Sequence, residues 1–431
     1  MSFVAHRGLR RLTLGRQGLC RMSTSAVEPS PTGPEESSTS LAPSATTAPS
    51  TTESALAEVV ETAPAPRWRV ATYNVLSPNL CSAGYFTFSK PEACEPAKRL
   101  ARVQNKLDEE IGRNGIICLQ EVSHSWLGEL HTFFAKNKYT YIHDSYGYHF
   151  NGYMGVGVAF NHEKYALEDC KVVRIADTKG GGYALRNNKP RLSPLQMIFH
   201  RATGIIKNAF NALMALIWKP KPDLWWEVER RTNTAVFLRL QDRESGQKMC
   251  VSTYHMPCAF RTPPVISAHC SLLVKRINKL AQMDPYVIAG DFNLKPDSPM
   301  YELLTTGKFQ SEESKAEGDM PEPAFPGDRW AVASKFMPLK SAYAVTRGNE
   351  PEFTNLARTK SQPQGSFIEC LDYIFYQGPG IVAEATDELP SRESVADIVS
   401  FPTVDEPSDH IKIAAEFTLG NKRRKNSESS S

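Results

Sequence analysis

The chain has 431 residues, of which 41% are hydrophobic, so it is long enough to bury a sizeable core in one large domain or two ordinary ones. Its 50 basic residues nearly balance 47 acidic ones, and a formal charge of +3 argues against a uniformly basic surface that binds any nucleic acid. No apolar run reaches the roughly 20 residues of a membrane-spanning helix, which indicates a soluble or peripheral protein. The nine cysteines lack zinc-ligand spacing, which favours a reducing compartment.

The two ends of the chain differ in composition from its middle. Residues 1–27 contain five arginines and no acidic residue, which is typical of a mitochondrial transit peptide, and 28–66 are mostly Ser, Thr, Pro, Ala and Glu, which is typical of a linker. Residues 421–431 are basic and then serine-rich, which favours a solvated tail over a nuclear address. We therefore expect a folded domain over 67–420 and a mitochondrial location, with the cytoplasm or nucleus as alternatives.

Between these ends, β-like runs alternate with longer helical stretches. So many strands, interrupted by helices that must cover an apolar surface, are most simply housed in two packed sheets with helices outside. The expected strands are 67–76, 116–122, 153–160, 234–240, 249–254, 286–289, 371–376 and 411–417, and the expected helices are 97–113, 126–137 and 264–283.

Many of these strands end or begin at a polar residue of catalytic type. Each motif alone has a structural reading, as a turn residue, a capping amide or a solvent-facing acid. Six of them on one chain indicate a single cleft, because a rigid sheet brings strand ends together. The residues are Asn74, Glu121, His255, Asp291 with Asn293, Asp372, and Asp409 with His410.

The order and the residues of these motifs resemble those of the endonuclease/exonuclease/phosphatase superfamily. The resemblance covers residues 67–418 and implies an α/β (α+β) fold, the DNase I-like four-layer α/β/β/α sandwich of two mostly antiparallel sheets flanked by helices. The motifs are ATYNVL at 71–76, ICLQEV at 117–122, GDFN at 290–293, LDYIF at 371–375 and PSDH at 407–410.

This resemblance implies a Mg²⁺-dependent phosphodiester hydrolase, with Mn²⁺ as a possible substitute. Glu121 supplies a hard oxygen ligand of the kind that Mg²⁺ prefers, Asn74 holds it or completes the shell through water, and Asp409 adds an acidic group near the metal.

The remaining residues would act on water and phosphate. Asp291 is the candidate to orient or deprotonate the attacking water, with Asn293 beside it. His410 would donate to a non-bridging oxygen while Asp372 binds its other ring nitrogen, and His255 would lie against the phosphate. Both Asp291 and His410 stay open as the general base.

Within the superfamily, the sequence is most similar to the branch of poly(A) deadenylases and nocturnin. The segments PDSPMY at 296–301 and EPEFTN at 350–355 carry this similarity. The resemblance makes Phe367 and Asn293 candidates to hold an adenine by stacking and hydrogen bonding; their structural readings are a core residue and a turn-capping amide.

Three departures from the branch affect the pocket. After His255 the chain runs MPCAF at 256–260, whereas the branch places a proline a few residues further on. The loop from 355 to 367 is longer, and residues 176–231 form an insertion with basic and tryptophan-rich stretches. We expect the insertion to be a capping helix, with a lid or an RNA- or membrane-binding surface as the alternative.

The favoured function is a 3′-to-5′ exoribonuclease, deadenylase-like, that releases 5′-nucleotides from single-stranded RNA. The enzyme alternative is a phosphatase or phosphodiesterase acting on a small nucleotide or other phosphorylated metabolite. The alternative from a different class is an inactive nucleic-acid-binding module on the same fold; the presence of Glu121, Asp291 and His410 argues against it.

Overall fold

The computed structural model describes residues 67–178, 224–319 and 337–420. The transit peptide, the linker, the C-terminal tail and most of the insertion lie outside these residues, so what we expect of them stays a prediction. None of the described helices is both long and apolar enough to cross a membrane.

The described chain alternates strands with helices, as the sequence pattern indicates. The strands are β1 Arg67–Asn74, β2 Ile116–Val122, β3 Tyr139–Ser145, β4 Gly155–Asn161, β5 Tyr165–Arg174, β6 Thr234–Asp242, β7 Lys248–His255, β8 Tyr286–Asp291, β9 Lys340–Ser341, β10 Asn355–Ala357, β11 Phe367–Glu369, β12 Asp372–Gln377, β13 Ile381–Thr386 and β14 Ile413–Leu419. The α-helices are α1 Pro96–Gly112, α2 Leu127–Lys136, α5 Leu224–Glu229, α6 Pro263–Ala281, α7 Pro299–Thr306, α8 Glu312–Gly318 and α9 Ala342–Arg347, with short 3₁₀ turns η1 Pro91–Ala93, η2 His124–Trp126, η3 His149–Asn151, η4 Ile175–Thr178 and η5 Glu393–Val395.

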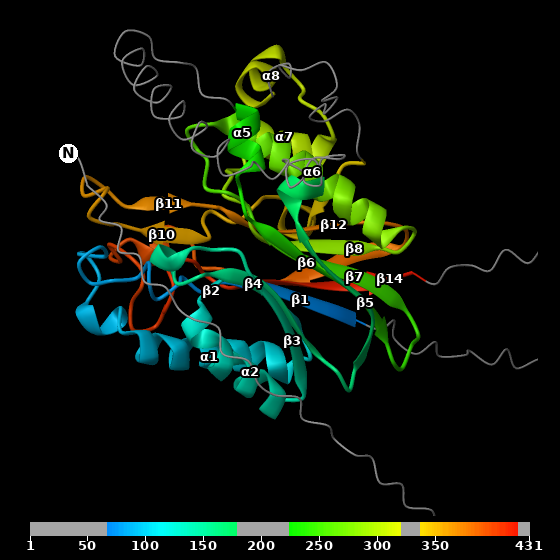
Figure 1. The fold of residues 1–431 in the computed structure, drawn as a ribbon, viewed down its shortest axis with the longest axis horizontal. Helices are drawn as coiled ribbons and strands as arrows, with labels where there is room; N and C mark the ends of the chain where they lie inside the picture. The colour runs from blue at the N-terminus through cyan, green and yellow to red at the C-terminus, as the bar shows by residue number, and fades with distance from the viewer. Residues whose placement is uncertain (1–66, 179–223, 320–336, 421–431) are drawn as a thin grey trace, which may run out of the picture. The chain divides into compact units, whose positions relative to one another are not determined.

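Two six-stranded sheets form the centre of the fold, with strand orders β13-β14-β1-β2-β4-β3 and β5-β6-β7-β8-β12-β9. Most neighbours are antiparallel, but β1 pairs in parallel with β2 and β7 with β8. Helices α1 and α2 cover the outer face of the first sheet, and α5, α6 and α7 cover the second (Figure 1). The strands β10 and β11 form a separate hairpin. The expected four-layer sandwich is therefore confirmed.

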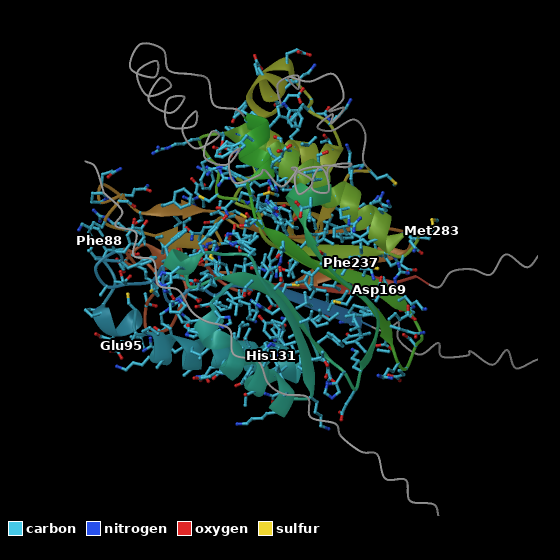
Figure 2. The ribbon with its side chains drawn as sticks, viewed as in Figure 1. Phe88, Glu95, His131, Asp169, Phe237 and Met283 are labelled. Carbon is cyan, nitrogen blue, oxygen red and sulfur yellow. The ribbon has the colours of Figure 1, made fainter. Side chains whose placement is uncertain are left out.

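Three apolar cores separate the four layers, and alternation along each strand assigns side chains to them. In β2, Ile116 and Cys118 face the core between the sheets, whereas Ile117 and Leu119 face α1 and α2. In the second sheet, Phe237 belongs to the core under α6 and lies well inside the molecule, in contrast to the exposed Met283 at its edge (Figure 2). Both faces of the central strands are thus buried, which explains their nearly continuous apolar runs.

Helix α1 also joins two catalytic motifs through a buried arginine. Arg99 donates to the carbonyl oxygens of Val75 and Leu76 at 2.6 and 2.7 Å and to that of Pro407 at 2.6 Å. Pro96 begins the helix, where its missing N–H is tolerated. Leu100, the residue after Arg99, packs into the core between α1 and the first sheet. The helix therefore holds the end of β1 against the segment that carries Asp409 and His410.

The sequence pattern did not indicate the strands β3, β5, β9, β10, β11 and β13, nor the short helices α7, α8 and α9. In β5, exposed and partly buried residues dominate, because it is an edge strand that lacks the apolar run of a central strand. Cys118, Cys250 and Cys370 are buried, whereas Cys258 is exposed.

Candidate active site

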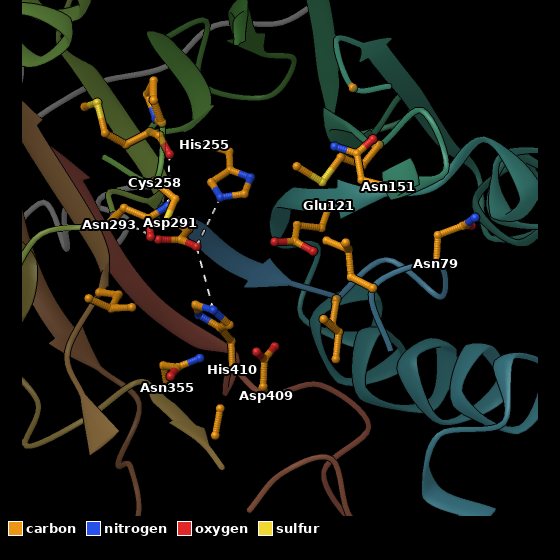
Figure 3. A pocket seen from close by; sticks show the side chains of 18 of the residues that line it. Asn79, Glu121, Asn151, His255, Cys258, Asp291, Asn293, Asn355, Asp409 and His410 are labelled. Carbon is orange, nitrogen blue, oxygen red and sulfur yellow. Dashed lines mark hydrogen bonds and ion pairs between the residues drawn. The ribbon is translucent and has the colours of Figure 1, made fainter. Parts of the chain in front are cut away.

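All eight predicted polar residues except Asn74 and Asp372 line one cavity, and those two lie directly behind it. The cavity has a volume of about 920 Å³ and opens where the ends of both sheets meet. Figure 3 shows Asp291 near its centre, with His255 and His410 on either side of the carboxylate and Glu121 facing them.

Strand pairing in the second sheet places three of these residues side by side. The parallel β7–β8 ladder aligns His255 with Asp291, and the antiparallel β8–β12 ladder aligns Asp291 with Asp372. His255 Nε2 lies 3.4 Å from Asp291 Oδ2, and His410 Nε2 lies 3.7 Å from the same oxygen. One carboxylate oxygen therefore faces two imidazoles, one from the end of β7 and one from the segment that precedes β14.

His410 is oriented by a buried hydrogen-bond chain. Its Nδ1 donates to Asp372 Oδ2 at 2.7 Å, and the hydroxyl of Thr354 donates to the same oxygen at 2.7 Å. Burial alone lowers the pKa of His410, but the carboxylates of Asp372 and Asp291 outweigh burial and raise that pKa well above its ordinary value. The ring therefore retains both protons, with Nε2–H directed at the cavity.

Glu121 reaches the cavity because of a bulge in β2. The pairing of β2 with β4 shifts register between Leu119 and Val122, and Glu121 has a φ of 57°, in the left-handed region. In a regular strand Glu121 would share the helix-covered face with Leu119; the bulge turns it away and gives that face to Val122. A non-glycine residue in this conformation is strained, as often occurs at functional sites.

Asn74 orients the two central carboxylates. Its Nδ2 donates to Asp291 Oδ2 at 3.0 Å and to Glu121 Oε1 at 3.3 Å, while its Oδ1 accepts from the N–H of Leu76. The N–H of Ser77 donates to Glu121 Oε2 at 3.1 Å. The amide oxygen of Asn74 is therefore engaged with the backbone, which makes positioning its main visible role.

The chemistry of the donor set fits a hard cation between Glu121 and Asp409. Both carboxylates line the cavity, and within the described residues neither forms an ion pair with a lysine or arginine. Burial raises the pKa of Asp409. The positive charges of His410 and Arg99 oppose this shift, and the negative charge of Glu121 adds to it. Oxygen ligands of this kind suit Mg²⁺, since two carboxylates in one cavity repel each other until a cation neutralises their charge.

A second cluster of ligand-type groups consists of Asp291, Asp372 and His410, whose nearest ligand atoms all lie within 4.8 Å of one another. Since Nδ1 of His410 is already bonded to Asp372, this cluster is better suited to holding and moving a proton.

The candidate base-binding residues also line the cavity. Asn293 has a φ of 47° and donates from Nδ2 to the carbonyl oxygen of Met256 at 2.9 Å, so its amide is tied to the chain after His255. Phe367 is partly exposed, and Phe260 packs against its ring edge-on, with centroids 6.4 Å apart. An aromatic ring therefore lies beside Phe367 in the segment where the deadenylase pattern has its proline.

Sequence reasoning missed two supporting residues, Tyr146, which lies outside every motif, and Thr354, whose partner the motif does not indicate. The hydroxyl of Tyr146 lies 2.7 Å from Nδ1 of His255, and Thr354 supports Asp372 as described above. Burial raises the pKa of Tyr146 well above its ordinary value, as do the nearby charges of Glu121 and Asp291, so the phenol keeps its proton. Thr354 belongs to a quoted motif, but only the fold shows that it faces Asp372.

Comparison with known families identifies the fold and the site together. The model of the Endonuclease/Exonuclease/phosphatase family matches residues 71–410, which include the eight residues predicted from the motifs. The chain belongs to this family. This membership makes it a hydrolase of the endonuclease/exonuclease/phosphatase type.

Curated relatives lie in the branch that the motifs indicate. The chain is 28% identical over 214 residues to the CCR4-Not complex 3'-5'-exoribonuclease subunit Ccr4 of Candida albicans, which covers 47% of this chain and 25% of that protein. It is 27% identical over 394 residues to carbon catabolite repressor protein 4 homolog 1 of Arabidopsis thaliana, which covers 83% of this chain and 59% of that protein. The chain thus matches between a quarter and three fifths of the length of these relatives.

Among solved structures, the fold is similar to that of ANGEL2, a 2',3'-cyclic phosphatase, in complex with adenosine-2',3'-vanadate. The TM-score is 0.58 at 19% sequence identity, over 82% of this chain and 96% of that chain. At this identity the likeness shows the shared fold of two sheets flanked by helices.

Proposed function

We propose that this chain is a Mg²⁺-dependent exoribonuclease that shortens single-stranded RNA from its 3′ end and releases 5′-nucleotides. The observation that supports the chemistry is the convergence of Glu121, Asp291 and His410 on one cavity, from both sheets. The Ccr4 relative is a 3'-5'-exoribonuclease subunit, and this supports the choice of RNA.

In this proposal Mg²⁺, held by Glu121 and Asp409, would neutralise phosphate charge and lower the pKa of a bound water. Asp291 accepts a proton from the attacking water: its Oδ1 is fixed by the N–H of Asn293 at 2.9 Å, and its Oδ2 faces the cavity. We assign this role to Asp291 because Nδ1 of His410 is already bonded to Asp372, and the raised pKa of that imidazole favours it as a donor.

The two histidines would then hold the phosphate. His410 donates from Nε2 to a non-bridging oxygen, and the negative charge of Asp372 stabilises the imidazolium. The Tyr146 hydroxyl donates to Nδ1 of His255, which leaves the proton of that ring on Nε2, on the side of Asp291. Water adds to phosphorus as Asp291 takes its proton, the bond to the 3′ oxygen breaks, and that oxygen takes up a proton from solvent. A 5′-nucleotide and a 3′-hydroxyl end are released.

A panel of substrates tests this proposal. Purified protein is incubated with Mg²⁺ and 5′-labelled oligo(A), mixed-sequence RNA, single-stranded DNA or NADP, beside Asp291→Ala and the control Asp284→Ala. Asp284 pairs with Arg239 at 2.7 Å and does not line the cavity. We expect ladder-like shortening of RNA by the parent and the control and none by Asp291→Ala. No Mg²⁺-dependent turnover of any substrate would contradict the hydrolase proposal.

The second candidate is a phosphatase or phosphodiesterase acting on a small nucleotide. The contact between Phe260 and Phe367 favours it, because it places a second ring at the base site where the deadenylase pattern has a proline. Cleavage of NADP without cleavage of RNA in the same panel would select this alternative.

A further inference from the structure

An exposed aromatic pair lies on the rim of the cavity, in the connection between β3 and β4. Tyr148 and Phe150 are 51% and 69% exposed, their rings are nearly parallel at 10°, and the ring centroids are 6.3 Å apart. Both residues line the same cavity as Glu121 and Asp291. Large apolar rings gathered at such a position usually mark a binding surface, because exposing them to water is unfavourable. We call this pair the aromatic platform.

The platform is held in place by its own loop. The N–H of Tyr148 donates to Asn151 Oδ1 at 2.7 Å, and the N–H of Tyr153 donates to the carbonyl oxygen of Tyr148 at 2.8 Å. Gly152 has a φ of 68°, and a Cβ there would lie 2.4 Å from Asn79 Oδ1, so the tight turn requires glycine. A preformed surface loses little conformational entropy when a ligand binds.

This loop is also bonded to the catalytic residues. The hydroxyl of Ser77, next to the end of β1, donates to the carbonyl oxygen of Asn151 at 2.9 Å. Tyr146, two residues before the platform begins, contacts His255. The platform is therefore a continuation of the active-site wall and does not form a separate surface patch.

The platform and Phe367 lie on different sides of the reaction centre. In Figure 3, Asn151 lies beyond Glu121 on one side of the cavity, whereas Asn293 and Cys258 lie beyond Asp291 on the other. Phe260 follows Cys258 by two residues and contacts Phe367. A phosphodiester bound at Asp291 would thus have aromatic surface in both directions along the strand.

We propose that Tyr148 and Phe150 stack the base on the opposite side of the scissile phosphate from Phe367. The ligand is then a single nucleic-acid strand that occupies the site with at least two nucleotides, and this inference rests on the proposed exoribonuclease function. Stacking tolerates any base, because every base has a flat π face, so the platform recognises a strand and not a sequence. A protein partner would not need rings that share a cavity with the catalytic carboxylates.

Oligonucleotides with one missing base test the proposal. The first cleavage rate, as kcat/KM, is measured for 5′-labelled oligo(A) and for the same oligomer with an abasic residue next to the 3′-terminal nucleotide. For the parent we expect the abasic oligomer to be roughly 5- to 150-fold poorer, the range that corresponds to one lost base stack. For the double variant Tyr148→Ala with Phe150→Ala, we expect this ratio to fall to about one, since no stack remains to be lost.

The matched control is Tyr153→Ala, which removes an aromatic ring of similar exposure from the same loop but outside the cavity lining. It should keep the parent's ratio. A parental ratio near one, or a double variant that keeps the parent's ratio, would overturn the platform even if RNA is cleaved. If the parent cleaves neither oligomer, the proposed function fails, and the platform's role as a base-stacking subsite fails with it.

Discussion

The floor and the rim of the cavity are built in opposite ways. On the floor, Asp291, Asp372 and His410 are each at most 5% exposed and are held by hydrogen bonds from neighbouring strands. On the rim, Phe150 and Phe260 are 69% and 45% exposed and are carried by loops. The floor contains the groups that act on a phosphodiester, whichever substrate carries it. The rim contains surfaces that contact the bases attached to that phosphodiester.

This difference assigns the chemistry to the floor of the cavity and the substrate specificity to its rim. Substitutions on the floor should change kcat, because they alter groups that act at the reacting phosphate. Substitutions on the rim should change KM, since stacking a base contributes equally before and during the reaction. The two regions can therefore be separated by whether a substitution changes kcat or KM.

The largest effect is expected from Asp291→Asn. Asparagine keeps the volume of the side chain but does not accept a proton, so kcat on oligo(A) should fall by about 10²- to 10⁴-fold. The measurement is the initial rate at saturating RNA, with circular dichroism to confirm folding. Asp284→Asn, at the opposite end of β8, is the control and should match the parent. A kcat for Asp291→Asn within threefold of the parent would remove Asp291 from the mechanism.

A smaller effect is expected from Thr354→Val, which removes a hydrogen bond to Asp372 but leaves Asp291, Asp372 and His410 themselves unchanged. The Thr354 hydroxyl donates to Asp372 and accepts from the N–H groups of Leu371 and Asp372. Loss of this support should misplace His410 and lower kcat roughly 10- to 100-fold. The buried N–H groups left without an acceptor should lower the free energy of unfolding by about 1–3 kcal/mol. Urea unfolding and steady-state kinetics check both; an unchanged kcat would show that Asp372 needs no such support.

On the rim, Phe367→Ala should affect substrate affinity. Removing one base stack should raise KM for oligo(A) roughly 5- to 150-fold while kcat stays within a few-fold of the parent. Phe88→Ala is the matched control, since Phe88 is 38% exposed but does not line the cavity. A fall in kcat at unchanged KM would show that Phe367 acts at the reaction centre, and the contrast between floor and rim would no longer hold.

The smallest effect on kcat is expected from Glu110→Gln, in a charge cluster away from the cavity. Glu110 is fully buried and accepts two hydrogen bonds from Arg69, at 2.6 and 2.8 Å, and one from Lys412. Burial raises the pKa of Glu110, but these cations outweigh burial and lower the pKa below its ordinary value. Kcat should remain at the parental value, whereas the free energy of unfolding at pH 7 should fall by about 3–5 kcal/mol.

The pH dependence follows from the direction of that shift. A carboxyl with a lowered pKa in the folded state stabilises the fold above the unfolded pKa, about 4.3 for glutamate, and this contribution is lost as pH falls through the folded pKa. Urea unfolding at pH 7 and in acid should therefore show a gap between parent and Glu110→Gln that narrows at low pH. A gap of constant size would mean that the cluster stabilises the fold by packing alone.

The floor could be predicted from sequence because strand ends carry its residues in short motifs. Glu121 and Asp372 were found in this way, and the two-sheet fold followed from the number of apolar strands. The bulge that aims Glu121 could not be predicted, since it is a register shift visible only in the pairing of β2 with β4. Tyr146 and Phe150 lie outside every motif, in a loop whose path depends on contacts with Ser77 and Gly152.

The most direct test of the account measures the Mg²⁺ dependence of hydrolysis in the parent and in Glu121→Gln. After chelation of metal, single-turnover rates on 5′-labelled oligo(A) are followed while Mg²⁺ is added back, and the released nucleotide is identified. The account predicts no cleavage without Mg²⁺, release of 5′-AMP by the parent, and a half-maximal Mg²⁺ concentration at least about tenfold higher for Glu121→Gln. Cleavage that persists after chelation, or identical Mg²⁺ curves for the two proteins, would contradict it.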